Sequence, residues 1–180
     1  MKKIYLDLDN TVMQTTKAIV DIYNDDFSAY SNFKYIDYRQ VHSWYFDELE
    51  LCDRDYINNL FNQPRFFRIV KMFPNAKEKI DELSNKYKIV FVSMCYYPNK
   101  KLKEIWVKEN FPYAKFISVD FNKYLNKSHI DMSDGIAFID DSVNNLKESN
   151  CSRNICFDDG FDYNNSWKGE ILTDWRKLYV

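Results

Sequence analysis

The segment IYLDLDNTV, residues 4–12, decides how the rest of the chain is interpreted. It starts as a short apolar run and ends in two carboxylates, Asp7 and Asp9, followed by the hydroxyl of Thr11. Because side chains alternate between the two faces of a strand, Asp7 and Asp9 are expected to point the same way. Buried carboxylates are costly without a partner, and Mg²⁺ takes oxygen ligands of this kind. The segment therefore predicts a buried strand that ends at a metal site, although two acids that only cap a turn would give the same pattern.

Apolar runs and helical periodicity predict an alternation of strands and helices along the rest of the chain. Strands are expected over residues 88–93, 115–120, 135–140 and 154–157. Helices are expected from Pro74, from Pro98, over residues 143–147 and from Ser166 into the C-terminal tail. The first of these strands contains the continuous apolar run IVFV, which is typical of a parallel strand buried on both faces. This alternation predicts an α/β fold with a three-layer, Rossmann-like parallel sheet and right-handed crossovers.

Polar side chains end three of the predicted strands. Asp7 and Asp9 follow the first strand, Ser93 ends the second, and Asp140 and Asp141 end the fourth. Ligands of parallel α/β sheets bind beyond the carboxyl ends of the strands, so these side chains are expected to share one site. One of Asp140 and Asp141 is expected to bind the metal directly and the other to hold a metal-bound water or a lysine, and the sequence leaves open which.

Residues 15–72 differ from the rest of the chain because they show helical spacing and no strand-like run. We expect a small helical block that lies over the end of the first strand. In this division of the chain, the core domain consists of residues 1–14 and 73–180, and the block is an insertion into it.

Composition limits the class of protein. The chain has 180 residues, with 25 Lys and Arg against 27 Asp and Glu and a net charge of −2, so no nucleic-acid partner is expected. Four cysteines without a CxxC pair, and two histidines, disfavour a zinc site and suit free thiols in a reducing compartment. Asp7 and Asp9 lie where a signal peptide needs an apolar stretch, and no apolar run has the length of a membrane helix. We therefore expect a soluble cytoplasmic protein with no membrane partner, either a monomer or a homodimer.

Four sequence elements, in this order, resemble the signature of the haloacid dehalogenase-like (HAD) phosphohydrolase superfamily. They are DLDNT at residues 7–11, Ser93 at the end of a strand, Lys127, and IDD at residues 139–141. The helical block lies where members of this superfamily insert a cap domain between the first two motifs. The resemblance thus implies a HAD-like core with a small helical cap.

A closer resemblance is to the 5′(3′)-deoxyribonucleotidases. It is carried by QPRFFR at residues 63–68, FPNA at 73–76, Lys127-Ser128 and Trp167. The chain departs from that family at Asn10 and Arg65, where Gly is common. Asn10 suits the turn after the first strand, since a short polar residue tolerates such a conformation, whereas Arg65 bears on the substrate preference of the cap.

The resemblance implies a phosphatase reaction in which Asp7 and Asp9 are the catalytic residues. Asp7 would attack phosphorus and form an aspartyl phosphate. Asp9 would protonate the leaving alkoxide and then activate a water molecule, help that is typically worth about 10²- to 10⁴-fold. The backbone carbonyl of Asp9 is expected to face Mg²⁺ together with the carboxylates of Asp7, Asp140 and Asp141. An acid at position 9 distinguishes the phosphatases of the superfamily from its dehalogenases and transport ATPases.

The expected phosphate contacts are Thr11, the hydroxyl of Ser93, the backbone N–H of Met94, and Lys127. Lys127 would offset negative charge on both the phosphate and the nucleophile. A rival for this role is Lys123, and the spacing before the Asp-Asp pair favours Lys127.

Aromatic side chains are frequent in the helical block and could either stack on a nucleobase or form the core of the block itself. They include Trp44, Tyr45, Phe46, Phe66 and Phe67. We expect one or two of them to line a pocket, with Trp44 and either Phe66 or Phe67 the preferred candidates.

Three functions are compatible with these residues. The leading hypothesis is a Mg²⁺-dependent phosphomonoesterase that hydrolyses deoxyribonucleoside or ribonucleoside monophosphates. A second keeps the chemistry but changes the substrate to a sugar phosphate or another small phosphomonoester. A third is a regulator that binds phosphate without catalysis. Asp9 argues against the third, because a phosphate acceptor alone does not need an acid for the leaving group.

Overall fold

The computed structural model describes residues 1–160 and 165–180, and six strands in these residues form one parallel sheet. The order of the strands across the sheet is β3-β2-β1-β4-β5-β6. Their bounds are β1 Lys3–Leu6, β2 Lys88–Cys95, β3 Lys115–Asp120, β4 Gly135–Asp140, β5 Asn154–Phe157 and β6 Glu170–Leu172. The predicted α/β class with a parallel, Rossmann-like sheet is confirmed, and β3, β4 and β5 have the predicted bounds.

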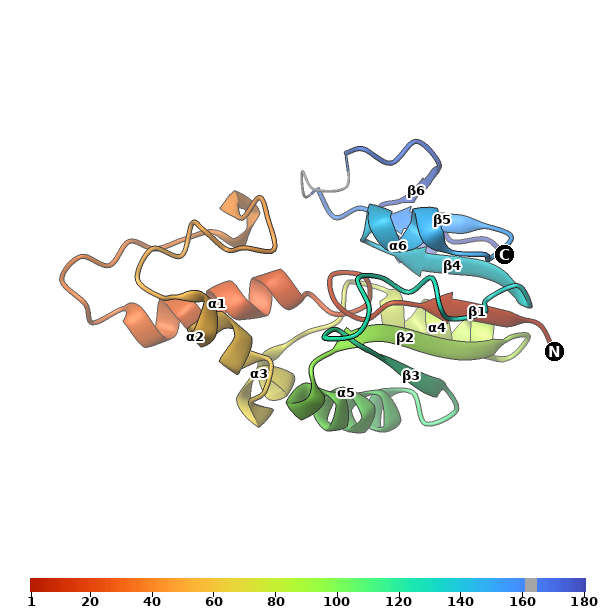
Figure 1. Ribbon diagram of the computed structural model, residues 1–180, viewed down its shortest axis with the longest axis horizontal. Helices are drawn as coiled ribbons and strands as arrows, with labels where there is room; N and C mark the ends of the chain where they lie inside the picture. Colours follow the sequence, from red (N-terminus) through yellow and green to blue (C-terminus); the bar gives the residue numbers. More distant parts are fainter. Residues whose placement is uncertain (161–164) are drawn as a thin grey trace.

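Successive side chains of a strand point to opposite faces of the sheet, and both faces are covered by apolar clusters. Ile4 and Leu6 of β1 belong to one apolar cluster, together with residues of α4 (Ala76–Ser84) and α5 (Tyr97–Asn110). Tyr5 belongs to a second cluster, together with α6 (Val143–Glu148). Figure 1 shows α6 in front of the sheet and α4 behind it. The sheet is therefore the middle of three layers, which explains why its strands are apolar on both faces.

The segment between β1 and β2 forms the expected helical block. Its helices are α1 (Thr15–Phe27), the 3₁₀ helix η1 (Tyr38–Gln40), α2 (Arg54–Leu60) and α3 (Pro64–Ile69). Figure 1 shows that the block extends from the carboxyl ends of the strands, on the side opposite the two chain termini. The prediction of helices inserted after the first strand is confirmed.

The two connections between the block and the core run side by side. The backbone N–H of Gln14 donates to the carbonyl of Lys71 at 2.8 Å, and the N–H of Phe73 donates to the carbonyl of Val12 at 2.9 Å. We propose on this basis that the division into a core of residues 1–14 and 73–180 and a cap of residues 15–72 is the domain organisation.

The predicted closing helix from Ser166 is wrong. The described part of this tail contains the edge strand β6 and the 3₁₀ helix η3 (Trp175–Lys177). Leu172 and Trp175 are buried, as expected for apolar residues, but Leu172 pairs with Phe157 of β5 and the Trp175 ring lies 5.7 Å from the Phe157 ring. The open edge of β5 offers backbone hydrogen bonds that an isolated helical turn lacks, so pairing overrides the helical spacing.

No helix in the described part of the chain is both long enough and apolar enough to cross a bilayer.

Candidate active site

The turn that follows β1 is fixed by its own backbone. The Leu8 carbonyl accepts hydrogen bonds from the N–H groups of Val12 and Met13 at 3.0 and 2.8 Å. Asn10 has a φ of 50°, in the left-handed region that Asn tolerates better than most residues. The Asn10 side chain also accepts a hydrogen bond from the backbone N–H of Thr16 at 2.9 Å. These bonds hold Asp7 and Asp9 in one conformation of the turn.

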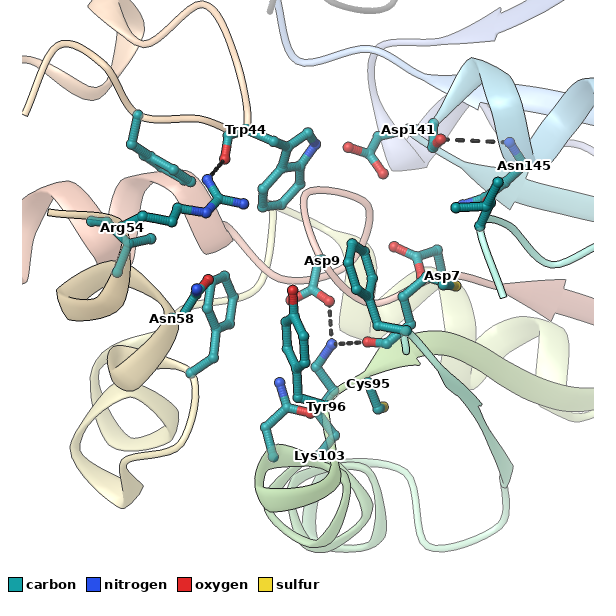
Figure 2. A pocket seen from close by; sticks show the side chains of 18 residues that line it. Asp7, Asp9, Trp44, Arg54, Asn58, Cys95, Tyr96, Lys103, Asp141 and Asn145 are labelled. Carbon is teal, nitrogen blue, oxygen red and sulfur yellow. Dashed lines mark hydrogen bonds and ion pairs between the residues drawn. The ribbon is translucent and has the colours of Figure 1, made fainter. Parts of the chain in front are cut away.

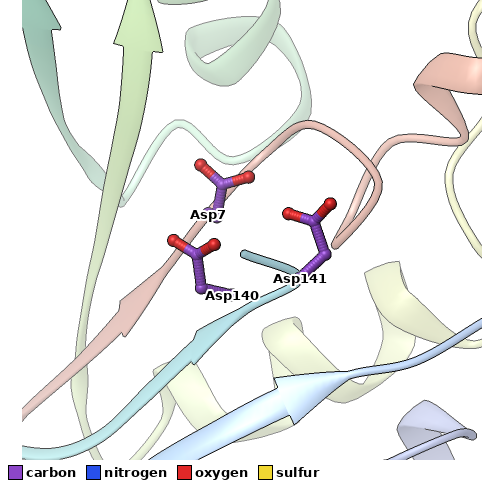
Figure 3. Close-up of side chains that lie close together, drawn as sticks. All are labelled: Asp7, Asp140 and Asp141. Atoms are coloured by element: carbon purple, nitrogen blue, oxygen red, sulfur yellow. The ribbon is translucent and has the colours of Figure 1, made fainter. Parts of the chain in front are cut away.

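The carboxylates of Asp7, Asp140 and Asp141 form a buried acidic cluster beyond the ends of β1 and β4. One oxygen of each carboxylate lies within 4.8 Å of the others, and all three residues are buried. Figure 3 shows the three carboxylates facing a common space. β4 ends at Asp140, so Asp141 lies in the following turn and the two acids do not diverge as they would within a strand.

Lys127 connects two members of this cluster. Its ammonium group donates to Asp7 and, at 2.6 Å, to Asp140, and the lysine side chain is buried. Burial disfavours the charged ammonium, but Asp140 and Asp7 outweigh this effect and raise the pKa of Lys127 above its ordinary value. Burial also raises the pKa of Asp7 to about 7, against the opposing effect of Lys127 and with the help of Asp140. The predicted rival Lys123 instead lies on the surface, 3.8 Å from Asp120.

Asp140 and Asp141 have different surroundings. Asp140 accepts hydrogen bonds from the Ser142 N–H at 2.8 Å and from the Asn145 amide at 3.2 and 3.1 Å, in addition to Lys127. Asp141 lines the pocket described below, together with Asp7. Asp140 thus bonds to the lysine, whereas Asp141 lines the pocket, which bears on the question that the sequence left open.

The carboxylate of Asp9 contacts a second lysine. It accepts hydrogen bonds from Lys103, from the Ser93 hydroxyl at 3.2 Å and from the Thr15 hydroxyl at 3.0 Å. β1 ends at Leu6, so Asp7 and Asp9 lie in the turn after the strand and strand alternation does not explain their directions. Both nevertheless line the cavity described below.

Sequence reasoning missed Lys103, which lies on α5. The buried residues of that helix are Asn99, Lys103, Trp106 and Val107, a spacing that forms one helical face. A lysine in the middle of a buried face was the signal that could have identified it. Apolar spacing alone predicts a face of Leu102, Ile105, Trp106 and Phe111, of which Trp106 and Phe111 are buried and Ile105 is exposed.

A cavity of about 290 Å³ lies between the sheet and the helical block. At the floor of the cavity, the core contributes Asp7, Asp9, Asp141 and Lys103. Met94, Tyr96 and Phe121 lie beside them. The block contributes Trp44 and Phe46, and α2 and the residue after it contribute Arg54, Ile57, Asn58 and Phe61. Figure 2 shows Trp44 and Arg54 on the block side, facing Asp141 and Asp9 across the cavity. Aromatic and aliphatic side chains, with Arg54 and Asn58 among them, lie above a charged floor, a mixture that is common for small-molecule sites.

Of the residues predicted for a substrate pocket, only Trp44 lies at the cavity. Trp44 lines it, but Phe66 is completely buried in the core and neither Phe66 nor Phe67 lines it. Phe66 packs against Phe61 and Phe67, with ring centroids 5.4 and 5.1 Å away. The aromatic residues of α3 thus form the interior of the block, because a helix this short needs an apolar face to pack at all.

The remaining predicted phosphate contacts divide into two groups. Met94 lines the pocket, and Ser93 lies behind it, bonded to Asp9. Thr11 does not line the pocket: its hydroxyl is buried and has no hydrogen-bond partner within the described residues. Its carbonyl accepts from the Trp175 indole at 3.2 Å, so the structure gives Thr11 a place in the turn and not at a ligand.

Arg65, where the chain departs from the deoxyribonucleotidase pattern, also lies away from the pocket. Its guanidinium is 2.7 Å from Asp26 of α1, and Asp26 accepts a hydrogen bond from Tyr56 of α2 at 2.7 Å. Arg65 therefore ties three helices of the block together.

Comparison with known proteins places this geometry in a family. A family model described as 5′ nucleotidase, deoxy (pyrimidine), cytosolic type C protein matches residues 1–179. The chain belongs to this family. A curated 5′(3′)-deoxyribonucleotidase of Clostridium acetobutylicum is 30% identical over 91 residues, which cover 51% of this chain and 48% of that protein. The match thus spans about half the length of that relative.

Solved structures of HAD hydrolases share the fold of this family member. A haloacid dehalogenase-like hydrolase of Streptococcus pneumoniae has a TM-score of 0.66 at 14% identity, covering 98% of this chain and 95% of that one. A HAD family hydrolase of Deinococcus radiodurans, described with bound phosphate and sodium, has a TM-score of 0.65 at 12% identity, covering 98% and 92%. The resemblance to the HAD superfamily is confirmed at the level of the fold.

Proposed function

We propose that this protein is a phosphomonoesterase that hydrolyses nucleoside monophosphates, with deoxy forms preferred, through an aspartyl phosphate on Asp7. One observation carries the proposal. Asp7 and Asp141 of the acidic cluster, together with Asp9, line the floor of a cavity whose block side includes Trp44, Phe46 and Phe61, and Lys127 joins Asp7 to the third acid of the cluster, Asp140. The floor has the groups that phosphoryl transfer needs, and the block side has flat apolar walls that suit a base.

The acidic cluster fits a divalent cation. Asp7, Asp140 and Asp141 offer hard oxygen ligands, and only one ammonium group, that of Lys127, lies among the three in the described contacts. The three carboxylates are buried, and Lys127 contacts two of them, Asp7 and Asp140. We therefore assign the cluster to Mg²⁺, and a HAD hydrolase of Bacillus subtilis with a TM-score of 0.61 is described as bound to magnesium. When bound, the ion would neutralise phosphate charge and orient the phosphate toward Asp7.

The described side chains divide the work of the reaction. Asp7 is the proposed nucleophile, because it lines the cavity within the acidic cluster. Lys127 holds Asp7 in place and offsets its charge, Asp140 holds Lys127, and Asn145 donates to Asp140. Asp9 lines the cavity beside Asp7 and is the proposed acid and base. The Met94 backbone and the Ser93 hydroxyl are the proposed phosphate contacts at the end of β2.

The substrate must be chosen by the helical block. The end of the sheet can contact only the phosphoryl group, whereas Trp44, Phe46 and Phe61 face the group that leaves. Aromatic walls favour a base through stacking, about 1–3 kcal/mol per ring contact in related sites. A bare sugar would meet the same walls with unpaired hydroxyl groups. The family description supports a nucleotide, and we extend the proposal to a cytoplasmic enzyme that acts on free nucleotides as a monomer or homodimer.

The experiment that tests this function is phosphate release by the purified protein with Mg²⁺, over deoxyribonucleotides, ribonucleotides and sugar phosphates. We expect the highest kcat/KM for a deoxyribonucleoside monophosphate. Higher kcat/KM for a sugar phosphate than for every nucleotide would contradict the proposal and favour the second hypothesis. No turnover of any phosphomonoester would favour a regulator.

A further inference from the structure

Lys103 is a buried lysine without a role in the reaction described so far. Its side chain is 2% exposed, and its ammonium group donates to Asp9, to the Ser93 hydroxyl at 2.9 Å and to the Met94 carbonyl at 2.8 Å. Figure 2 shows it rising from α5 to the Asp9 carboxylate. These three acceptors use all three N–H groups of the ammonium, so Lys103 is fixed in one position.

Packing alone does not account for this lysine. The same face of α5 carries Trp106 and Val107, which pack on the sheet as apolar residues. Burying an ammonium group costs free energy that an apolar side chain of similar size would not cost. Lys103 also lines the cavity, next to Asp9. Lys127 donates to Asp7 and Asp140, whereas Lys103 donates to Asp9.

We propose that Lys103 is a positioning residue for Asp9: it fixes the carboxyl group beside the leaving oxygen and compensates its negative charge. Both Asp9 oxygens are held by hydrogen bonds, one to the Thr15 hydroxyl and the other to Lys103 and the Ser93 hydroxyl. In the proposed reaction, Asp9 is negative after it has protonated the leaving group and before it deprotonates water. Lys103 thus stabilises Asp9 in the interval between the two half-reactions.

This role of Lys103 rests on the proposed function, in which the reaction has two half-reactions. A bond forms between an Asp7 oxygen and phosphorus while the bond from phosphorus to the leaving oxygen breaks. The proton of Asp9 goes to that oxygen, which leaves Asp9 negative beside Lys103. Water then attacks phosphorus, gives a proton to Asp9 and releases phosphate and the Asp7 carboxylate. Lys103 keeps its own protons throughout and touches neither phosphorus nor water.

The test compares two leaving groups in one protein sample. p-Nitrophenolate leaves without a proton, whereas the alkoxide of a nucleoside monophosphate or of glycerol phosphate needs one. For Lys103→Met, we expect kcat/KM on the alkyl substrates to fall about 10-fold or more beyond its fall on p-nitrophenyl phosphate. Because both values come from one sample, their ratio does not depend on how much of the variant is folded. Asp9→Asn should show the same pattern more strongly.

Three further variants make the role of Lys103 specific. In the double variant of Asp9→Asn and Lys103→Met, the ratio of the two kcat/KM values should equal that of Asp9→Asn alone, because Lys103 acts through Asp9. Lys103→Arg should restore most of the ratio, since it keeps the charge. Lys101→Met is the matched control, because Lys101 lies on the same helix with its side chain 73% exposed, and it should leave the ratio unchanged.

Equal losses on alkyl and aryl phosphates in Lys103→Met would overturn the proposal and make Lys103 a structural residue only. An additional change of the ratio in the double variant would also overturn it. A wild-type protein that hydrolyses glycerol phosphate but no nucleotide would contradict the proposed substrate and leave the role of Lys103 intact. A wild-type protein that hydrolyses neither class would remove both.

Discussion

The Lys127 ammonium group lies 2.6 Å from the Asp140 carboxylate and also donates to Asp7. These contacts join the loop between β3 and β4 to the end of β4, 13 residues away, and to the end of β1, 120 residues away. A buried lysine between two carboxylates leaves the cluster of Asp7, Asp140 and Asp141 negative overall. The cluster is therefore suited to a divalent cation and to a phosphate that brings further negative charge.

Asp7→Asn should abolish turnover while the fold is retained. The amide cannot attack phosphorus and is a poor ligand for a divalent cation, but it has nearly the shape of the carboxylate. Phosphate release and thermal unfolding of the same preparation measure the two effects. Asp21→Asn is the control, because Asp21 forms an exposed pair with Lys17 on α1 and should keep full activity. Substantial turnover by pure Asp7→Asn protein would remove Asp7 from the role of nucleophile.

Removal of divalent metal should abolish activity, and Mg²⁺ should restore it. The reason is the repulsion between the phosphate dianion and three buried carboxylates. Mg²⁺ should also raise the Tm of the wild-type protein, since a ligand that binds the native state stabilises it. Asp141→Asn should weaken that rise, whereas Asp131→Asn, outside the cluster, should not. Full activity after dialysis against EDTA would contradict the assignment of the cluster.

The structure separates two aromatic residues that sequence reasoning grouped together. Phe66→Ala should destabilise the protein by about 3–5 kcal/mol, because Phe66 is completely buried within the block. Trp44→Ala should change stability less and should raise KM for nucleotides far more than for p-nitrophenyl phosphate, because Trp44 lines the cavity. Denaturant unfolding and steady-state kinetics measure both. An equal rise of KM on both substrates in Trp44→Ala would show that Trp44 does not contact the base.

The order and approximate positions of the strands could be predicted from sequence, because apolar runs mark buried parallel strands, although β2 continues to Cys95, two residues beyond its predicted end. Asp7, Ser93 and Asp140 were therefore placed correctly at one edge of the sheet. Lys103 and Phe121 were not found, because their positions depend on how a helix and a loop pack on the sheet and not on local pattern. The prediction for the C-terminal tail was wrong for a related reason. The spacing of Leu172 and Trp175 suits a helix, but the free edge of β5 was available for pairing.

The aromatic residues of the block show a second limit of sequence reasoning. Composition predicts that a small helical block rich in Phe, Tyr and Trp needs a core, but it does not say which rings form that core. The Phe66 side chain lies in the core of the block, whereas the Trp44 side chain lines the pocket. Arg65 could not be assigned either, because its partner Asp26 lies 39 residues away on another helix.

Deoxyribonucleotides should be preferred to ribonucleotides, but by no more than about 10²-fold in kcat/KM, because an apolar wall rejects an added hydroxyl only weakly. The cavity side formed by Phe46, Ile57 and Phe61 supplies such a wall. Matched pairs of nucleotides that differ only at the 2′ position measure the preference. A preference for ribonucleotides would show that a polar group contacts the 2′-hydroxyl.

The most direct test of the central claim is to identify the residue that carries the phosphoryl group. The enzyme is mixed with a deoxyribonucleoside monophosphate and quenched in acid, and the acyl phosphate is reduced with borohydride, which converts the phosphorylated Asp to homoserine. Trypsin then releases residues 4–17, which contain both Asp7 and Asp9, and fragmentation in the mass spectrometer distinguishes them. Homoserine at position 7 in wild type, and none in Asp7→Asn, is the predicted result. Homoserine at position 9, or none at either position during active turnover, would contradict the account.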